Sequence, residues 1–135
     1  MAVLVSSCVG TAQPVVAADF GPETLGLVNS YRGNRGLPLL SSHPTLKALA
    51  RQHSQYQAAR HHIGHDGYRE RSAKAKAAGT SGICVENVGA GYRDARQLFS
   101  GWRSSRRHNR NLLRQGLRYA GISVVGGYAT FFACE

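Results

Sequence analysis

The sequence predicts an α+β domain in which several helices pack on a small antiparallel sheet. Several segments repeat apolar residues at helical spacing, and about three others are rich in β-branched or aromatic residues. Gly126-Gly127 separates the last two of these strands, as a hairpin turn does. A chain of 135 residues, 42% of them apolar, is expected to form one domain that buries about two-thirds of its unfolded surface.

The first half of the chain predicts three helices. They are expected at residues 22–32, 44–60 and 68–78. In the second helix Pro44 suits the first helical position, and Ser42 or His43 suits the cap. His53 falls on the apolar face of this helix, which predicts a buried histidine with its hydrogen bonds satisfied. A place beside a functional cleft is the alternative for His53.

The second half predicts three strands and two further helices. The strands are expected at residues 83–88, 120–125 and 128–134, and the helices at 95–102 and 109–114. Asp94 suits the cap of the longer helix. Leu98, Phe99 and Trp102 recur there at helical spacing, so Trp102 is expected in the core and not on a binding surface.

The N-terminus is typical of an export signal. An apolar run opens the chain without a basic region before it, and small residues at 15–18 precede Asp19 as a signal-peptidase site requires. We therefore interpret residues 1–18 as an apparently truncated signal peptide and expect the folded domain at 19–135. The expected location is secreted or periplasmic. Cys8 follows Val5-Ser6-Ser7 as in a bacterial lipobox, so lipid attachment at Cys8 is the alternative to a simple signal segment.

The cysteine count agrees with export. Once Cys8 leaves with the signal, Cys84 and Cys134 remain, and an even number in an exported chain indicates a disulfide. Such a bridge would stabilise the fold by roughly 3 to 4 kcal/mol in the chain-entropy model. Two buried free thiols are the alternative.

Five short segments carry a family resemblance. In order they are Val28-Asn29-Ser30-Tyr31-Arg32 running into Gly36-Leu37-Pro38-Leu39, Leu46 to His53-Ser54, the turn at His65, Glu86-Asn87, and Trp102 to Leu113. Their order and spacing resemble the CAP superfamily, which includes cysteine-rich secretory, antigen 5 and pathogenesis-related proteins, and especially its compact bacterial branch. The resemblance covers roughly residues 23 to 134.

The resemblance implies a three-layer α-β-α sandwich with a cavity that holds two histidines and two acids. By motif, this chain supplies His65, Glu86 and His108, with Asn87 beside them, but it has no carboxylate where relatives place the fourth group. Water would have to complete a metal shell on these three residues. We therefore expect no required cofactor and, at most, weak binding of a divalent cation such as Zn²⁺ by His65, Glu86 and His108.

The three residues leave the function open between several classes. A binding module of the cell envelope or extracellular space is the main expectation, and a metal-assisted hydrolase that uses the same three residues is the alternative. Ser105 is a candidate nucleophile beside His108, but no Asp is placed by sequence to orient the imidazole. Lipid or sterol binding, which the resemblance implies for some relatives, is a third possibility.

The charge of the chain also bears on its binding partners. The net charge is +10, and six arginines follow one another without an acid between residues 103 and 118: Arg103, Arg106, Arg107, Arg110, Arg114 and Arg118. Such a surface attracts polyanions, and anionic envelope polymers or lipids are the partners available to an exported protein. Nucleic acid is not expected, because no nucleic-acid-binding pattern or interleaved stacking aromatics accompany the arginines. The mature chain has no transmembrane segment in its sequence and is expected to be a monomer.

Overall fold

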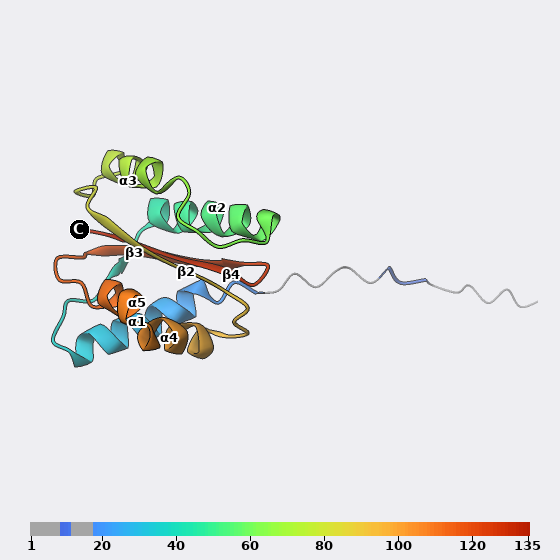
Figure 1. The fold of residues 1–135 in the computed structure, drawn as a ribbon, viewed down its shortest axis with the longest axis horizontal. Helices are drawn as coiled ribbons and strands as arrows, with labels where there is room; N and C mark the ends of the chain where they lie inside the picture. The colour runs from blue at the N-terminus through green and yellow to red at the C-terminus, as the bar shows by residue number, and fades with distance from the viewer. Residues whose placement is uncertain (1–8, 12–17) are drawn as a thin grey trace, which may run out of the picture.

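A four-stranded sheet separates two layers of helices (Figure 1). The computed structural model describes residues 9–11 and 18–135. Helices α2 (Pro44–Arg60) and α3 (Tyr68–Ala77) cover one face of the sheet. Helices α1 (Gly21–Asn34), α4 (Ala95–Ser104) and α5 (Arg106–Leu112) cover the other. The predicted α-β-α sandwich is confirmed.

The sheet runs in the order β1-β3-β4-β2. Its strands are β1 (Ser41–Ser42), β2 (Cys84–Ala90), β3 (Tyr119–Val125) and β4 (Tyr128–Cys134). Gly126 and Gly127, with φ of 56° and 81°, make the predicted hairpin turn. The expected antiparallel sheet needs one correction, because β1 pairs with β3 in parallel and makes the sheet mixed. A strand of two residues shows no periodicity that a sequence pattern could detect.

Most helix ends follow local capping signals. His43 caps α2 by accepting a hydrogen bond from the Thr45 amide, and Asp94 caps α4 by accepting one from the Gln97 amide. The last helix departs from the expected range 109–114, since α5 already begins at Arg106. The cause is Ser105, whose hydroxyl accepts a hydrogen bond from the His108 amide and caps the helix three residues earlier.

Apolar side chains pack on both faces of the sheet. Phe131 and Phe132 are neighbours on β4 and therefore point to opposite faces, one into each core. Trp102, only 1% exposed, lies in the core beneath α1 and α4, and its indole N–H donates to the Val88 carbonyl. The predicted burial of Trp102 is confirmed.

Glycine allows α2 to approach the sheet closely. A Cβ atom on Gly121 of β3 would lie 2.3 Å from the backbone nitrogen of Lys47 on α2. Only a residue without a side chain fits at this contact.

Cys84 and Cys134 form the predicted disulfide, which joins the paired ends of β2 and β4. Asp19, just before α1, is tied to the fold: its carboxylate accepts hydrogen bonds from the amides of Gly21 and Val124 and from the Ser123 hydroxyl. Most of the predicted signal segment, including Cys8, lies outside the described residues. Within the described ranges, no helix has the length and apolar character needed to cross a bilayer.

Candidate functional site

Glu86 is the buried centre of the candidate site. It lies on β2, an edge strand of the sheet, and its side chain is 1% exposed. The guanidinium of Arg71 on α3 holds both carboxylate oxygens, with Nε 2.7 Å from Oε2 and Nη2 2.8 Å from Oε1. The imidazole of His65 lies on the same carboxylate, with Nδ1 2.9 Å from Oε1. His65 and Glu86 are therefore in direct contact.

The contact with Glu86 fixes the tautomer of neutral His65. Since an ionised carboxylate can only accept, Nδ1 must carry the proton and donate it. The other ring nitrogen, Nε2, is then a free acceptor. The His65 side chain is 54% exposed, so this acceptor belongs to a ring that a ligand can reach.

Arg71 is the site residue that sequence reasoning missed. Its side chain is 9% exposed, and besides Glu86 it donates from Nη1 to the backbone carbonyl of Asp66 at 2.7 Å. It thereby ties the loop that carries His65 to the strand that carries Glu86. Helical spacing could have indicated its burial, because Arg71 lies four residues before the buried Ala75 and so belongs to the inner face of α3.

Asn87 extends the site to the other layer of helices. Consecutive side chains of a strand point to opposite faces, so Glu86 faces α3 while Asn87 faces α5. The Asn87 amide donates to the backbone carbonyl of His108 at 3.1 Å, and its own oxygen accepts from Asn111 at 2.8 Å. The Glu-Asn pair therefore anchors both layers to the edge strand.

His108 comes near the cleft through α5 and does not contact Glu86. Its ring makes no hydrogen bond to any residue in the part of the chain that the structure describes, and only its backbone is tied to Asn87 and Ser105. Burial lowers the pKa of His108, and the neighbouring charges of His65 and Arg107 lower it further. Ser105 serves as the cap of α5, and a nucleophilic role for it stays a prediction.

His53 of α2 is a second imidazole close to Glu86. The structure confirms that His53 is buried, with Nε2 donating to the Gly64 carbonyl at 2.6 Å. The same nitrogen is 3.8 Å from Oε1 of Glu86. Burial lowers the pKa of His53, although the Gly64 carbonyl and Glu86 act in the other direction. A neutral ring at this distance is a polar neighbour of Glu86 and does not form an ion pair with it.

A cavity of about 330 Å³ opens beside β2. Its lining includes His65, Tyr68, Glu86 and Asn111. The Tyr68 hydroxyl also donates to the carbonyl of Cys84 and closes one end of the lining. The cavity therefore combines an exposed imidazole with amide and hydroxyl groups.

The donor set does not fit a divalent metal ion. Both oxygens of Glu86 already accept from the Arg71 cation, so a metal bound there would face a second positive charge and would have to displace a buried ion pair. In residues 9–11 and 18–135, no group of three or more His, Cys, Asp or Glu side chains is arranged to hold a metal ion. Metal binding by His65, Glu86 and His108 stays a prediction, and this geometry argues against it.

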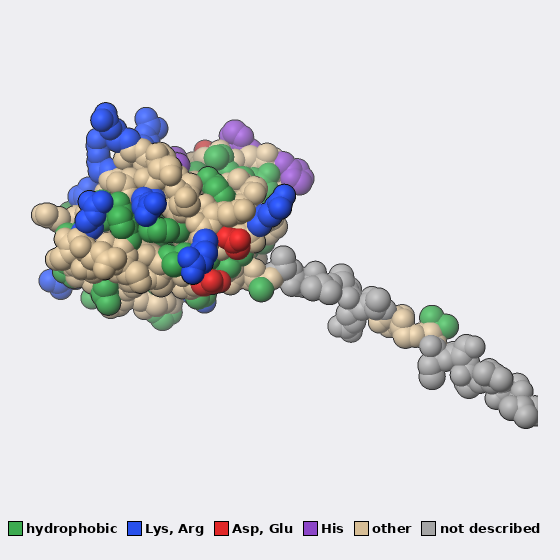
Figure 2. All heavy atoms as spheres, turned by 90° about the horizontal axis from the view of Figure 1, so that it is seen from below, with side chains coloured by type: hydrophobic (Ala, Val, Ile, Leu, Met, Phe, Trp, Pro, Cys, Tyr) green, Lys and Arg blue, Asp and Glu red, His purple; other side chains and the backbone are tan. Residues whose placement is uncertain are grey.

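The predicted basic surface lies on the layer of α1, α4 and α5, and all six arginines are exposed. Arg114 pairs with Glu135, and Arg103 lies over the ring of Phe99. Arg106, Arg107 and Arg110 of α5 form no ion pair with any residue that the structure describes. Figure 2 views this layer from outside and shows basic side chains spread over it, several of them toward one corner, with few acidic ones.

A family model described as "CAP: Cysteine-rich secretory protein family" matches residues 25–135. No curated protein sequence matches the chain. Three solved bacterial structures share the fold. An extracellular protein with an SCP domain from Bacillus anthracis aligns with a TM-score of 0.77 at 24% identity, over 85% of this chain and 40% of that one.

A cysteine-rich secretory protein of Staphylococcus aureus aligns with a TM-score of 0.74 at 22% identity, over 85% of this chain and 39% of that one. This chain thus spans about two-fifths of the length of these two proteins. An outer surface protein of Borrelia burgdorferi aligns with a TM-score of 0.70 at 16% identity, over 83% of this chain and 87% of that one.

Proposed function

Because the chain belongs to the CAP family, we propose that it is an exported binding domain that takes an anionic group of an envelope polymer or lipid at the cleft beside β2. Export is supported by the Ala-rich cleavage pattern before Asp19 and by the disulfide, which persists in oxidising compartments. The similar solved proteins are described as extracellular, secretory or outer-surface proteins. We propose a secreted or periplasmic location on these grounds.

The observation that carries the proposal is the division of α5 into two sides. Asn111 lines the cleft and His108 is half-buried, whereas Arg106, Arg107 and Arg110 are exposed along the same helix. Three arginines without ion pairs, on one helix of seven residues, create a local positive potential. An anionic chain that lies along α5 would bring its charged groups to the rim of the cleft.

His65 gives the cleft a second means of recognition. Its Nδ1–H is held by Glu86, so Nε2 is oriented for a hydroxyl or amide donor of the ligand. The carboxylate that orients it is itself fixed by Arg71, so the ring loses little freedom when a ligand binds.

Binding of a synthetic poly(glycerol phosphate) to residues 19–135 tests the proposal. We expect the triple variant Arg106→Gln/Arg107→Gln/Arg110→Gln to bind at least about tenfold more weakly and with a smaller salt dependence. The matched control is Lys47→Gln/Arg69→Gln/Lys76→Gln, which removes the same charge from exposed positions on the opposite layer. Equal losses in the two triple variants would show that net charge alone attracts the polymer.

Hydrolysis is a second candidate, and the His65–Glu86 pair is the observation that favours it. A histidine oriented by a carboxylate is the arrangement of a general base, and Nε2 could accept a proton from water. Cys84 cannot serve as a nucleophile because it is in the disulfide. Turnover of an envelope polymer that is abolished in both His65→Gln and Glu86→Gln would support this candidate.

A further inference from the structure

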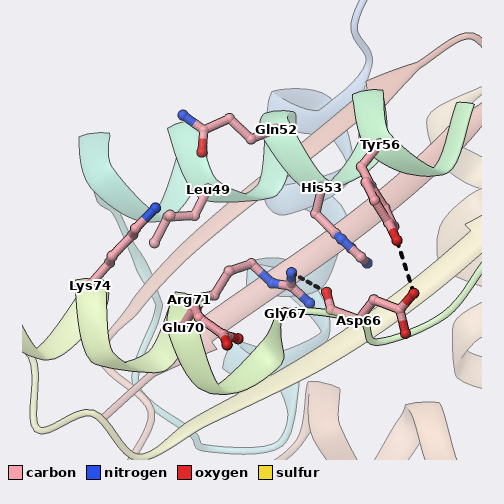
Figure 3. Close-up of a pocket in the computed structure, with 9 residues that line it drawn as sticks. All are labelled: Leu49, Gln52, His53, Tyr56, Asp66, Gly67, Glu70, Arg71 and Lys74. Carbon is pink, nitrogen blue, oxygen red and sulfur yellow. Dashed lines mark hydrogen bonds between the residues drawn. The ribbon is translucent and has the colours of Figure 1, made fainter. Parts of the chain in front are cut away.

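A second cleft, lined by a different set of residues from the proposed ligand cleft, lies between α2 and α3 (Figure 3). Its volume is about 300 Å³, at the lower end of the range of about 300 to 1,000 Å³ for small-molecule sites. Figure 3 shows His53 and Tyr56 reaching down from α2 and Arg71 reaching up from α3 into the space between the helices. The size suits a small ligand and not a folded partner.

Several hydrogen bonds hold one end of this cleft. Arg71, which is buried, binds Glu86 and the carbonyl of Asp66, and the Tyr56 hydroxyl donates to Oδ2 of Asp66 at 3.0 Å. Asp66 is thus fixed through both its backbone and its side chain. Its second oxygen, Oδ1, accepts no hydrogen bond from any residue that the structure describes, so it is available to a ligand.

The mouth of the cleft carries charges of both signs. Glu70 and Lys74 of α3 line it and are exposed. Their spacing of four residues would permit an ion pair along the helix, yet within the described ranges neither side chain forms one. In Figure 3 the two side chains diverge from α3, with Leu49 of α2 above them. The protein therefore leaves a carboxylate and an ammonium unneutralised at one small cavity.

We propose that the cleft between α2 and α3 binds a small zwitterion, such as a free dipeptide. The ammonium group of the ligand would pair with Glu70 and with Oδ1 of Asp66, and its carboxylate would pair with Lys74. Leu49 supplies an apolar contact for the part of the ligand between its charged ends. A neutral sugar would leave both charges uncompensated, and an anion would be repelled by Asp66 and Glu70.

The walls also exclude recognition of a long peptide through its backbone. The lining residues come from α2, α3 and the turn at Asp66 and Gly67, and none of them belongs to a strand, so no strand edge is available there for an extended chain to join. Recognition must come from side chains, and those in this cleft match a short ligand with a charged group at each end.

An NMR titration of isotope-labelled residues 19–135 with L-alanyl-L-alanine tests the proposal. We expect shift changes at the two walls of the cleft, and we expect N-acetylation or C-amidation of the dipeptide to weaken binding by about two- to fivefold each. Glu70→Gln should weaken binding of the free dipeptide by a similar factor and leave binding of the N-acetylated form unchanged. Lys74→Gln should do the same for the C-amidated form.

The matched controls are Glu23→Gln and Arg69→Gln, which remove the same charges from exposed positions outside the cleft and should leave binding unchanged. The proposal is overturned if the dipeptide produces no shift changes at the cleft, if the changes map to His65 and α5, or if the controls weaken binding as much as Glu70→Gln and Lys74→Gln. These outcomes do not depend on whether α5 binds an anionic polymer.

Discussion

One cation, the guanidinium of Arg71, compensates the buried negative charge of Glu86. Its side chain is almost completely buried, and Arg71 supplies two of the three hydrogen bonds that its oxygens accept. A buried carboxylate that loses its partner keeps the full cost of its desolvation. The stability of the fold and the order of the cleft therefore both depend on the ion pair between Arg71 and Glu86.

Arg71→Met should lower the free energy of unfolding by about 3 to 5 kcal/mol, because it leaves Glu86 buried and unpaired. Urea unfolding followed by circular dichroism measures this loss. Arg69→Met, on the exposed face of the same helix, should change stability by less than about 0.5 kcal/mol. A double variant, Arg71→Met/Glu86→Leu, should recover much of the loss. If Arg71→Met were as stable as Arg69→Met, the ion pair would contribute nothing.

Acid should destabilise the fold through His53. Burial holds the pKa of His53 below its ordinary value of about 6.5, so the unfolded chain binds the proton more readily than the native one. The free energy of unfolding should therefore fall as the pH drops below about 6.5, and His108, whose pKa is also lowered, adds a change of the same sign.

Unfolding of the wild type and of His53→Gln at pH 7.5 and pH 5.5 checks this expectation, and the variant should lose less stability between the two values. His62→Gln, at an exposed position, is the matched control. The same pH dependence in wild type and His53→Gln would contradict the assignment.

The family resemblance drew attention to His65 and Glu86, whose side chains are in contact in the structure, but it gave no indication of what supports them. Arg71 could not be distinguished from its neighbours Arg69, Lys74 and Lys76 without knowing which face of α3 packs on the sheet. A charged residue in a basic helix is usually exposed, and only the tertiary contact reverses this expectation.

At the scale of elements, local signals predicted helices better than edges of the sheet. Caps and apolar spacing located α2 and α4 within a residue or two, because those signals lie within the helix itself. The two-residue β1 is a strand only because it pairs with β3, which is far along the chain, so the local sequence gives no signal for it. The early start of α5 had a signal in Ser105 that the expected range overlooked.

The C-terminal end of α2 contains a strained residue. His61 adopts φ 51° in the left-handed region, where residues with a Cβ atom are disfavoured by roughly 1 to 2 kcal/mol. Glycine removes this strain, partly offset by its greater freedom in the unfolded chain. His61→Gly should therefore raise the free energy of unfolding by about 0.5 to 1 kcal/mol.

Urea unfolding measures the gain, with His61→Ala as the control that keeps the Cβ atom and should show no gain. A loss of stability in His61→Gly would mean that the imidazole contributes more than the backbone strain costs.

At the scale of the molecule, two cores share one sheet, and the disulfide lies in one of them. The disulfide closes a loop of 50 residues that contains α4, α5 and β3. It lies on the side of the sheet covered by α2 and α3, packed against Leu46 and Phe132. Cross-linking therefore restrains the half of the unfolded chain from which β2, α5 and the hairpin are built.

Replacing both cysteines, Cys84→Ala/Cys134→Ala, should lower the free energy of unfolding by about 3 to 4 kcal/mol in the chain-entropy model. The measurement is urea unfolding of the oxidised protein and of the double variant. Mass spectrometry of the exported protein after alkylation, with and without reductant, checks the bond itself. Two thiols that react without reductant would contradict the disulfide.

The Cys84–Cys134 disulfide also reports the order in which parts of the sheet fold. The β3–β4 hairpin closes through a two-residue turn and forms by local contacts, whereas β2 must find β4 across the 50 residues that separate their bonded cysteines. Cys84 meets Cys134 only when β2 has docked in its native register. We therefore expect native oxidation to follow hairpin formation, so that the rate at which Cys84 becomes protected from alkylation records the docking of the edge strand that carries Glu86.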